Sequence, residues 1–86
     1  MRVIIPSKLF MNDLSEAWKR GLNIKNLRNC VEALVFHGKI SEEYEDIRMF
    51  GRYEGFRQCR VDSEYMLLYR VDEEKVMLFR FKYQIN

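Results

Sequence analysis

The stretch from residue 44 to residue 69 constrains the fold most strongly, because it contains two strand-like segments joined by a short polar turn. Side chains alternate between the two sides of a strand, so Arg57 and Cys59 share one side of the first segment and Arg60 lies on the other. The second segment contains the run MLLY, which is apolar on both faces and is typical of a central strand. The sequence therefore predicts a sheet with this strand in its middle.

Two helical segments precede this stretch. The first is expected to begin after Ser7, a good N-cap, and to end at Gly21. The second is expected to run from Asn23, which can cap it, to Gly38. Because the link between them is so short, the helices are expected to form an antiparallel hairpin. The apolar residues that we expect to face the core recur at helical spacing. They are Phe10, Leu14, Ala17 and Trp18 in the first helix and Leu27, Cys30, Val31, Leu34 and Val35 in the second.

Strand patterns account for most of the remaining chain. The short apolar run RVII at the start is stopped by Pro6, and an acidic loop covers residues 39–46. Further strands are expected near residues 52–61, 64–71 and 75–83. The order β-α-α-β-β-β predicts an α+β fold, with a helical hairpin packed on a small antiparallel-rich sheet. At 86 residues the chain is expected to form one domain, 1–86.

Composition excludes several classes of protein. A charged fraction of 33% with one proline argues against disorder. No apolar run approaches the roughly 20 residues that span a bilayer, so we expect a cytoplasmic protein with no membrane partner. Cys30 and Cys59 form no CxxC motif and have only His37 as a possible co-ligand, so they are interpreted as buried thiols. No metal and no cofactor are expected.

Cationic residues on two of the predicted strands form the candidate site. Although the net charge is only +2, a local basic cluster can bind a polyanion. On the last strand, Arg80 and Lys82 are expected to share a face with Val76 and Leu78. If both strands present their cations to the same side, Arg60, Arg80 and Lys82 would form a shallow basic groove suited to RNA. The alternative is an ordinary solvated face.

The same residues resemble the RelE/ParE superfamily of toxins, and within it the YafQ-type mRNA interferases. The segment SKLFMNDLSEAWKRG is similar to that family's S-K-x-F-x-x-D-L-x-x-A-x-K-R-G helix. The segment EYEDIRMFGRYEGFRQCRV, followed by LLYRV, is similar to its Y-x-D-H-x-L-x-G-x-Y-x-G-x-R-x-C-H-V and L-I-Y pattern. This resemblance covers nearly all of the chain and implies the RelE-like fold.

The resemblance implies a toxin of a type II toxin-antitoxin system that acts as a ribosome-dependent mRNA endoribonuclease without a metal. Its implied partners are a small antitoxin of the DinJ or RelB kind and mRNA in the ribosomal A site. In this family a ribose 2′-OH attacks the adjacent phosphate. Such a reaction needs a base for the 2′ proton, cations for the charge on the phosphoryl oxygens and an acid for the leaving 5′ oxygen.

Three histidines of the family pattern are absent from this sequence. They fall on Ile47, Arg60 and Gln84. Arg60 can stabilise a phosphate but cannot accept a proton, since the pKa of arginine lies above about 12. The P-D-W of the family becomes the Ser-Glu-Tyr of residues 63–65, which keeps a carboxylate and a ring. Either the chain uses a set without histidines, as the RelE branch does, or its activity is attenuated.

The resemblance and the residues together suggest a role for each candidate. Arg60 and Arg80 are expected to clamp the phosphate, Glu64 to act as general base and Lys82 or Tyr83 as acid. Mutation of Arg80 to alanine is expected to abolish cleavage with little effect on the melting temperature. The candidate RNA contacts are Arg48, Arg52, Arg57, Gln84 and, as a platform for base stacking, Tyr65.

One functional alternative remains open. The domain could be a non-catalytic interaction module, either an antitoxin-binding remnant of a toxin or a ParE-like toxin that blocks gyrase by binding.

Overall fold

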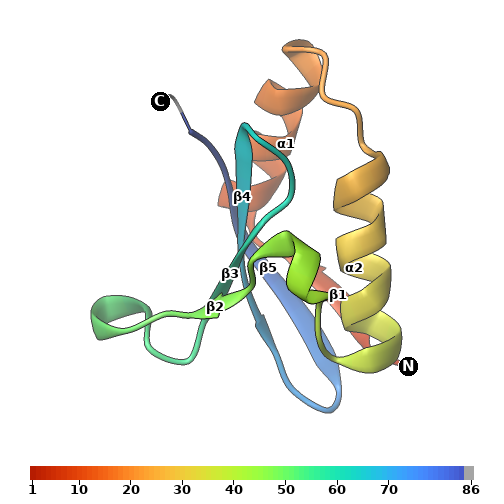
Figure 1. Ribbon diagram of the computed structural model, residues 1–86, viewed down its shortest axis with the longest axis vertical. Helices are drawn as coiled ribbons and strands as arrows, with labels where there is room; N and C mark the ends of the chain where they lie inside the picture. The colour runs from red at the N-terminus through yellow and green to blue at the C-terminus, as the bar shows by residue number, and fades with distance from the viewer. Residues whose placement is uncertain (85–86) are drawn as a thin grey trace.

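The computed structural model describes residues 1–84, which form a five-stranded sheet with two helices on one face (Figure 1). Neither helix is long and apolar enough to cross a membrane, as far as residues 1–84 are concerned. In chain order the elements are β1 (Val3–Pro6), α1 (Lys8–Lys19), α2 (Lys25–His37), the 3-10 turn η1 (Glu42–Tyr44), β2 (Ile47–Arg48), the 3-10 turn η2 (Gly51–Tyr53), β3 (Arg57–Arg60), β4 (Tyr65–Val71) and β5 (Lys75–Tyr83).

The strand order in the sheet is β1-β5-β4-β3-β2. β1 is parallel to β5, and the other pairs are antiparallel. The run MLLY lies in the central strand β4, as predicted, so the α+β fold is confirmed. The two-residue strand β2 was not predicted, and β3 is shorter than the predicted 52–61 because η2 occupies the start of that range.

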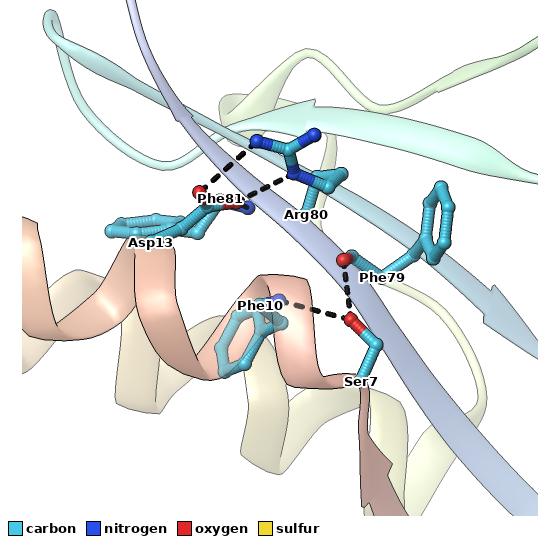
Figure 2. A network of polar contacts seen from close by, with 6 residues as sticks. All are labelled: Ser7, Phe10, Asp13, Phe79, Arg80 and Phe81. Carbon is cyan, nitrogen blue, oxygen red and sulfur yellow. Dashed lines mark hydrogen bonds and ion pairs between the residues drawn. The ribbon is translucent and has the colours of Figure 1, made fainter.

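Ser7 ends the pairing of β1 and begins α1, as its identity as an N-cap predicts (Figure 2). Its Oγ accepts a hydrogen bond from the Phe10 backbone N–H at 2.9 Å. The same hydroxyl donates to the Phe79 carbonyl at 2.6 Å, and the Ser7 backbone N–H donates to the Leu78 carbonyl at 2.8 Å. One residue therefore fixes the position of α1 against the middle of β5.

The core lies between the helices and the sheet. Cys30 and Cys59 are both fully buried with free thiols, as predicted. Trp18 was expected in the core but is 63% exposed, because Ala17 takes the inward position and the next residue turns about 100° away around the helix. The fully buried or nearly buried residues include Phe10, Ala17, Leu27, Cys30, Leu34, Cys59, Leu67, Tyr69, Val76, Leu78 and Phe81.

β5 contains a bulge near its middle. Arg80 pairs with Leu68 on β4, but Leu78 pairs with the next residue, Tyr69. Phe79 is therefore an extra residue on β5 with no partner of its own in the ladder. An extra residue reverses the alternation of side chains along the rest of the strand.

The bulge places Arg80 and Lys82 on the open face of the sheet, which we define as the face that the helices do not cover. Val76 and Leu78 precede the bulge and are buried on the helix side. The prediction that these four residues share a face is therefore wrong, because it assumed regular alternation through the strand. Arg60 does lie on the same face as Lys82, since both pair with the same residue of β4.

Candidate functional site

A cleft of ≈ 220 Å³ lies between α1 and the part of β5 that follows the bulge, and we call it the phosphate cleft after the ligand that we propose for it below. It exists because β1 ends at Pro6, opposite Leu78, so that α1 rather than a strand lies beside the rest of β5. Its lining contains three cationic side chains and two carboxylates. The lining residues are Asp13, Glu16, Ala17, Arg20, Tyr65, Arg80, Phe81, Lys82 and Tyr83.

Asp13 holds Arg80 in this cleft (Figure 2). Its Oδ2 accepts hydrogen bonds from Arg80 Nε at 2.8 Å and from the Phe81 backbone N–H at 3.0 Å, and its Oδ1 accepts from Arg80 Nη2 at 3.1 Å. The carboxylate thus accepts the hydrogen bond that the Phe81 backbone N–H would otherwise donate to a carbonyl of a neighbouring strand. Two parallel bonds also fix the plane of the guanidinium group. Sequence reasoning missed this role, although the residue is the aspartate of the S-K-x-F-x-x-D-L match.

The surroundings of Asp13 favour its charged form. Burial of the carboxyl group opposes ionisation, but hydrogen bonds from Arg80 and Phe81 and the charges of Arg80 and Lys82 outweigh it, so the pKa of Asp13 lies below its usual 3.8. A folded-state pKa below the unfolded value stabilises the fold above the unfolded pKa, and this stabilisation is lost as pH falls through the folded pKa.

Asp13→Asn should therefore lower the free energy of unfolding at pH 7 by about 1–3 kcal/mol, since the amide keeps one acceptor but turns an N–H group toward Arg80. The difference from the wild type should shrink as pH falls below 3.8. Urea denaturation at several pH values measures it. Glu16→Gln, on the same helix with a side chain 67% exposed, is the control and should change little. If Asp13→Asn lowered the free energy of unfolding equally at pH 7 and at pH 3, the stabilising role of the Asp13 charge would be contradicted.

A second cleft of ≈ 520 Å³ adjoins the first at the end of the sheet, and we call it the end cleft. Asp62 Oδ1 accepts from the backbone N–H groups of Glu64 at 2.8 Å and Tyr65 at 3.0 Å, which fixes the turn between β3 and β4. Glu64 Oε2 accepts from the Tyr83 hydroxyl at 3.3 Å. The lining residues are Arg20, Gly21, Leu22, Asn23, Asp62, Glu64, Tyr65 and Tyr83, of which Arg20, Tyr65 and Tyr83 also line the phosphate cleft.

The candidate catalytic residues divide between these two clefts. Arg80 and Lys82 line the phosphate cleft, Glu64 lines the end cleft and Tyr83 lines both. Arg60 lies on the open face but lines neither cleft. Its Nε is 3.1 Å from a carboxylate oxygen of Glu45, so part of its charge is already neutralised.

Tyr65 is a core residue rather than an exposed platform for base stacking, which corrects the prediction. The residue as a whole is only 5% exposed, and its ring stacks on Phe81 with 4.7 Å between centroids and lies 5.3 Å from the ring of Tyr83. The more accessible ring is that of Tyr83, which is 38% exposed. Gln84 extends the pairing of β5, since its backbone N–H donates to the Glu64 carbonyl at 2.7 Å.

Arg57 also departs from the predicted RNA contacts. It pairs with Tyr69 across the ladder and therefore lies on the helix side of the sheet, away from Arg60. Its Nε donates to Asp46 Oδ2 at 2.8 Å, and the Tyr69 hydroxyl donates to Asp46 Oδ1 at 2.6 Å. These two bonds make Arg57 part of a polar network beside the core, because the side chain of Asp46 is only 11% exposed.

Arg48 is the last residue of β2, and Arg52 lies in η2, within the connection between β2 and β3 that projects from one side of the sheet (Figure 1). Each guanidinium lies over a neighbouring aromatic ring, Arg48 over Phe50 at 5.0 Å and Arg52 over Tyr53 at 5.6 Å. Neither residue lines the phosphate cleft or the end cleft. The structure therefore does not bring the arginines of the β2–β3 region together with Arg80.

Sequence comparison connects the chain with known toxins. Residues 2–82 match the family model described as the bacterial toxin of type II toxin-antitoxin systems, YafQ. A Haemophilus influenzae protein that carries the YafQ name is 27% identical over 67 residues, which cover 74% of this chain. The chain spans 66% of the length of that curated relative, just under two thirds.

Solved structures share the fold. YafQ from Escherichia coli BL21(DE3) superposes with a TM-score of 0.86 at 22% identity, over 98% of this chain and 94% of that one. The E. coli DinJ–YafQ complex gives 0.85 at 21% identity, over 96% and 93%. A metal-bound toxin from Helicobacter pylori gives 0.86 at 28% identity, over 98% and 96%. Residues 1–84 of this chain contain no group of three or more His, Cys, Asp or Glu side chains placed to hold a metal ion.

The resemblance inferred from the sequence is confirmed by these comparisons. The matched region includes both helices and all but the last residue of the sheet, so it is not limited to one motif. The chain belongs to the YafQ family of bacterial toxins of type II toxin-antitoxin systems.

Proposed function

We propose that this toxin is a metal-independent endoribonuclease that cuts mRNA in the ribosomal A site. The observation that carries the proposal is the phosphate cleft, where Arg80 and Lys82 lie beside a tyrosine that is hydrogen-bonded to Glu64. Such a set supplies cations for a phosphoryl group together with groups that accept and donate protons. These are the requirements for attack of a ribose 2′-OH on the next phosphate.

Arg80 and Lys82 are the proposed phosphate ligands. A guanidinium group has five N–H donors, and Asp13 takes two of those of Arg80, through Nε and Nη2. The remaining donors can bind phosphoryl oxygens while Asp13 keeps the group in one orientation. Lys82 adds a second positive charge from the same cleft. Donors that are fixed before the reaction stabilise the charge that develops in the transition state.

Glu64 and Tyr83 are the proposed acid-base groups. The 2′ oxygen forms a bond to phosphorus as its proton passes to Glu64, and the bond from phosphorus to the 5′ oxygen breaks. The leaving oxygen takes a proton from Tyr83 or Lys82, and the product is a cyclic phosphate. Positioned groups of this kind contribute about 10²- to 10⁴-fold each. Because Glu64 and Tyr83 are hydrogen-bonded at 3.3 Å, each orients the other.

More peripheral RNA contacts are proposed for Arg60, which lies on the open face, and for Arg48, Arg52 and Gln84. We also propose that a small antitoxin binds and silences this toxin, as the E. coli complex of DinJ with YafQ suggests by analogy.

Induced expression of the toxin tests the proposal. Growth arrest together with translation-dependent breaks inside codons, mapped by primer extension, is the expected result. Arrest with intact message and accumulating DNA breaks would instead support a toxin that blocks gyrase. No arrest, combined with tight binding to an antitoxin encoded beside it, would identify an inactive interaction module.

A further inference from the structure

We propose that the end cleft is a binding site for one unpaired nucleobase, namely that of a nucleotide adjoining the phosphate at Arg80 and Lys82, and that Arg20 is its stacking residue. The inference rests on the proposed function, because the ligand is RNA. The two clefts share Arg20 and Tyr83, so a phosphate in one places a neighbouring nucleoside beside the other.

The charges of the two clefts favour a phosphate in the phosphate cleft and a nucleobase in the end cleft. The phosphate cleft has three cations, Arg20, Arg80 and Lys82, against two carboxylates. The end cleft has one cation, Arg20, against Asp62 and Glu64. An anion is therefore attracted to the first cleft and repelled by the carboxylates of the second. A nucleobase is neutral and planar, with polar edges, so the carboxylates of the end cleft do not repel it.

Arg20 is the outermost member of a stack that is anchored in the core. Its guanidinium lies 4.6 Å from the centroid of the Tyr83 ring. The Tyr83 ring lies 5.3 Å from that of Tyr65 and is tilted by 38° from it, and Tyr65 stacks on Phe81 at 4.7 Å. Tyr65 and Phe81 are buried, so the stack has a fixed base. Unpaired bases stack on arginine planes as well as on aromatic rings, and a preorganised plane loses little entropy on binding.

The rim of the end cleft offers both kinds of hydrogen-bonding group. Asn23 Oδ1 accepts from the Lys25 backbone N–H at 3.0 Å, which leaves the amide N–H groups of Asn23 to donate. Glu64 contributes a carboxylate on the turn side of the same cleft. Beside Gly21 the space is open, since a Cβ atom there would meet no atom within 4 Å. Donors and acceptors together match the polar edge of a base.

Binding of uncleavable dinucleotides to the intact toxin tests this site. The probe is a 2′-O-methylated dinucleoside monophosphate, which lacks the attacking hydroxyl, compared with two abasic versions that each lack one base. Isothermal titration should show that removal of one of the two bases weakens binding to the wild type by about fivefold or more. Arg20→Ala should weaken binding of the full probe by a similar factor, and base removal should then cost nothing further.

Two further variants separate stacking from charge. Arg20→Lys keeps the charge but lacks the planar group, so it should behave like Arg20→Ala, and it serves as the test if the alanine variant does not fold. Lys19→Ala removes a cation from the same end of α1, and this residue lines neither cleft, so it should bind like the wild type.

Equal affinities for the full and both abasic probes would overturn the base site, and so would equal effects of Arg20→Ala and Lys19→Ala. The proposed function would survive if binding still depended on Arg80. If the wild type bound neither the dinucleotide nor inorganic phosphate, the proposed RNA binding would fail, and the base site with it.

Discussion

Arg80→Ala is expected to lower the rate of RNA cleavage by about 10²- to 10³-fold, the usual loss when one fixed donor to a developing anion is removed. The reason is that Arg80 is held by Asp13 inside the phosphate cleft, at 2.8 Å and 3.1 Å. Cleavage of a defined message in a purified translation system measures the effect. The assay should be run well below the unfolding temperature of the variant.

The same substitution is also expected to cost about 1–3 kcal/mol of stability, because Asp13, with a side chain 18% exposed, would keep only its bond from Phe81. The contacts of Asp13 thus lead to a different expectation from the sequence, which predicted little effect of this substitution on the melting temperature. Arg80→Lys keeps the charge but cannot form the two-bond fork, so its cleavage rate should lie between those of the wild type and Arg80→Ala.

Arg70→Ala is the matched control for these variants. Arg70 is exposed on β4 and lines neither the phosphate cleft nor the end cleft, so its loss removes the same charge from the same sheet. If Arg70→Ala slowed cleavage as much as Arg80→Ala, a general charge effect would explain both. Full activity of Arg80→Ala would remove Arg80 from the reaction altogether.

Asp46→Ala is expected to produce the largest loss of stability, about 2–4 kcal/mol. Its carboxylate accepts from Arg57 at 2.8 Å and from the Tyr69 hydroxyl at 2.6 Å. Tyr69 is fully buried, so its hydroxyl would be left in the core without a partner. Burial, followed by the hydrogen bond to Asp46, raises the pKa of Tyr69 well above its usual 10, so this hydroxyl remains a donor at neutral pH.

Urea denaturation of matched variants measures the contribution of Asp46. Glu45→Ala removes the neighbouring carboxylate, which is 68% exposed and pairs with Arg60 at the surface, and it should change stability by less than about 1 kcal/mol. Tyr69→Phe in the Asp46→Ala background should recover part of the loss, because the unpaired hydroxyl is then gone. Equal losses of stability in Asp46→Ala and Glu45→Ala would contradict the structural role of the bonds from Arg57 and Tyr69 to Asp46.

Most elements could be predicted from local sequence, because caps and periodicity act over a few residues. The N-cap at Ser7, the left-handed Gly38 at the end of α2 and the limits of β5 at residues 75–83 all agree with the structure. The strand β2 could not be found in this way, since two residues are too few to show alternation. The cap predicted at Asn23 is displaced by one residue, to Ile24, although the Asn23 side chain still accepts from the Lys25 backbone N–H.

The site was less predictable than the fold. The resemblance pointed to Arg60, Arg80 and Glu64, but it could not show that Arg60 stands outside both clefts or that Tyr65 is buried. Acidic partners of the arginines were also missed, because Glu45 and Asp46 precede β3 by more than ten residues.

By itself, the sequence determined the two helices, the central strand, the antiparallel-rich sheet and the family, since each of these depends on local pattern or on matched motifs. Only the tertiary structure decided which side chains meet. The extra residue Phe79 moves Arg80 and Lys82 to the open face, and the early end of β1 lets α1 bring Asp13 and Arg20 to β5. The first outcome depends on the register of the hairpin formed by β4 and β5, and the second on contacts between segments about 60 residues or more apart in the sequence. No local pattern encodes either.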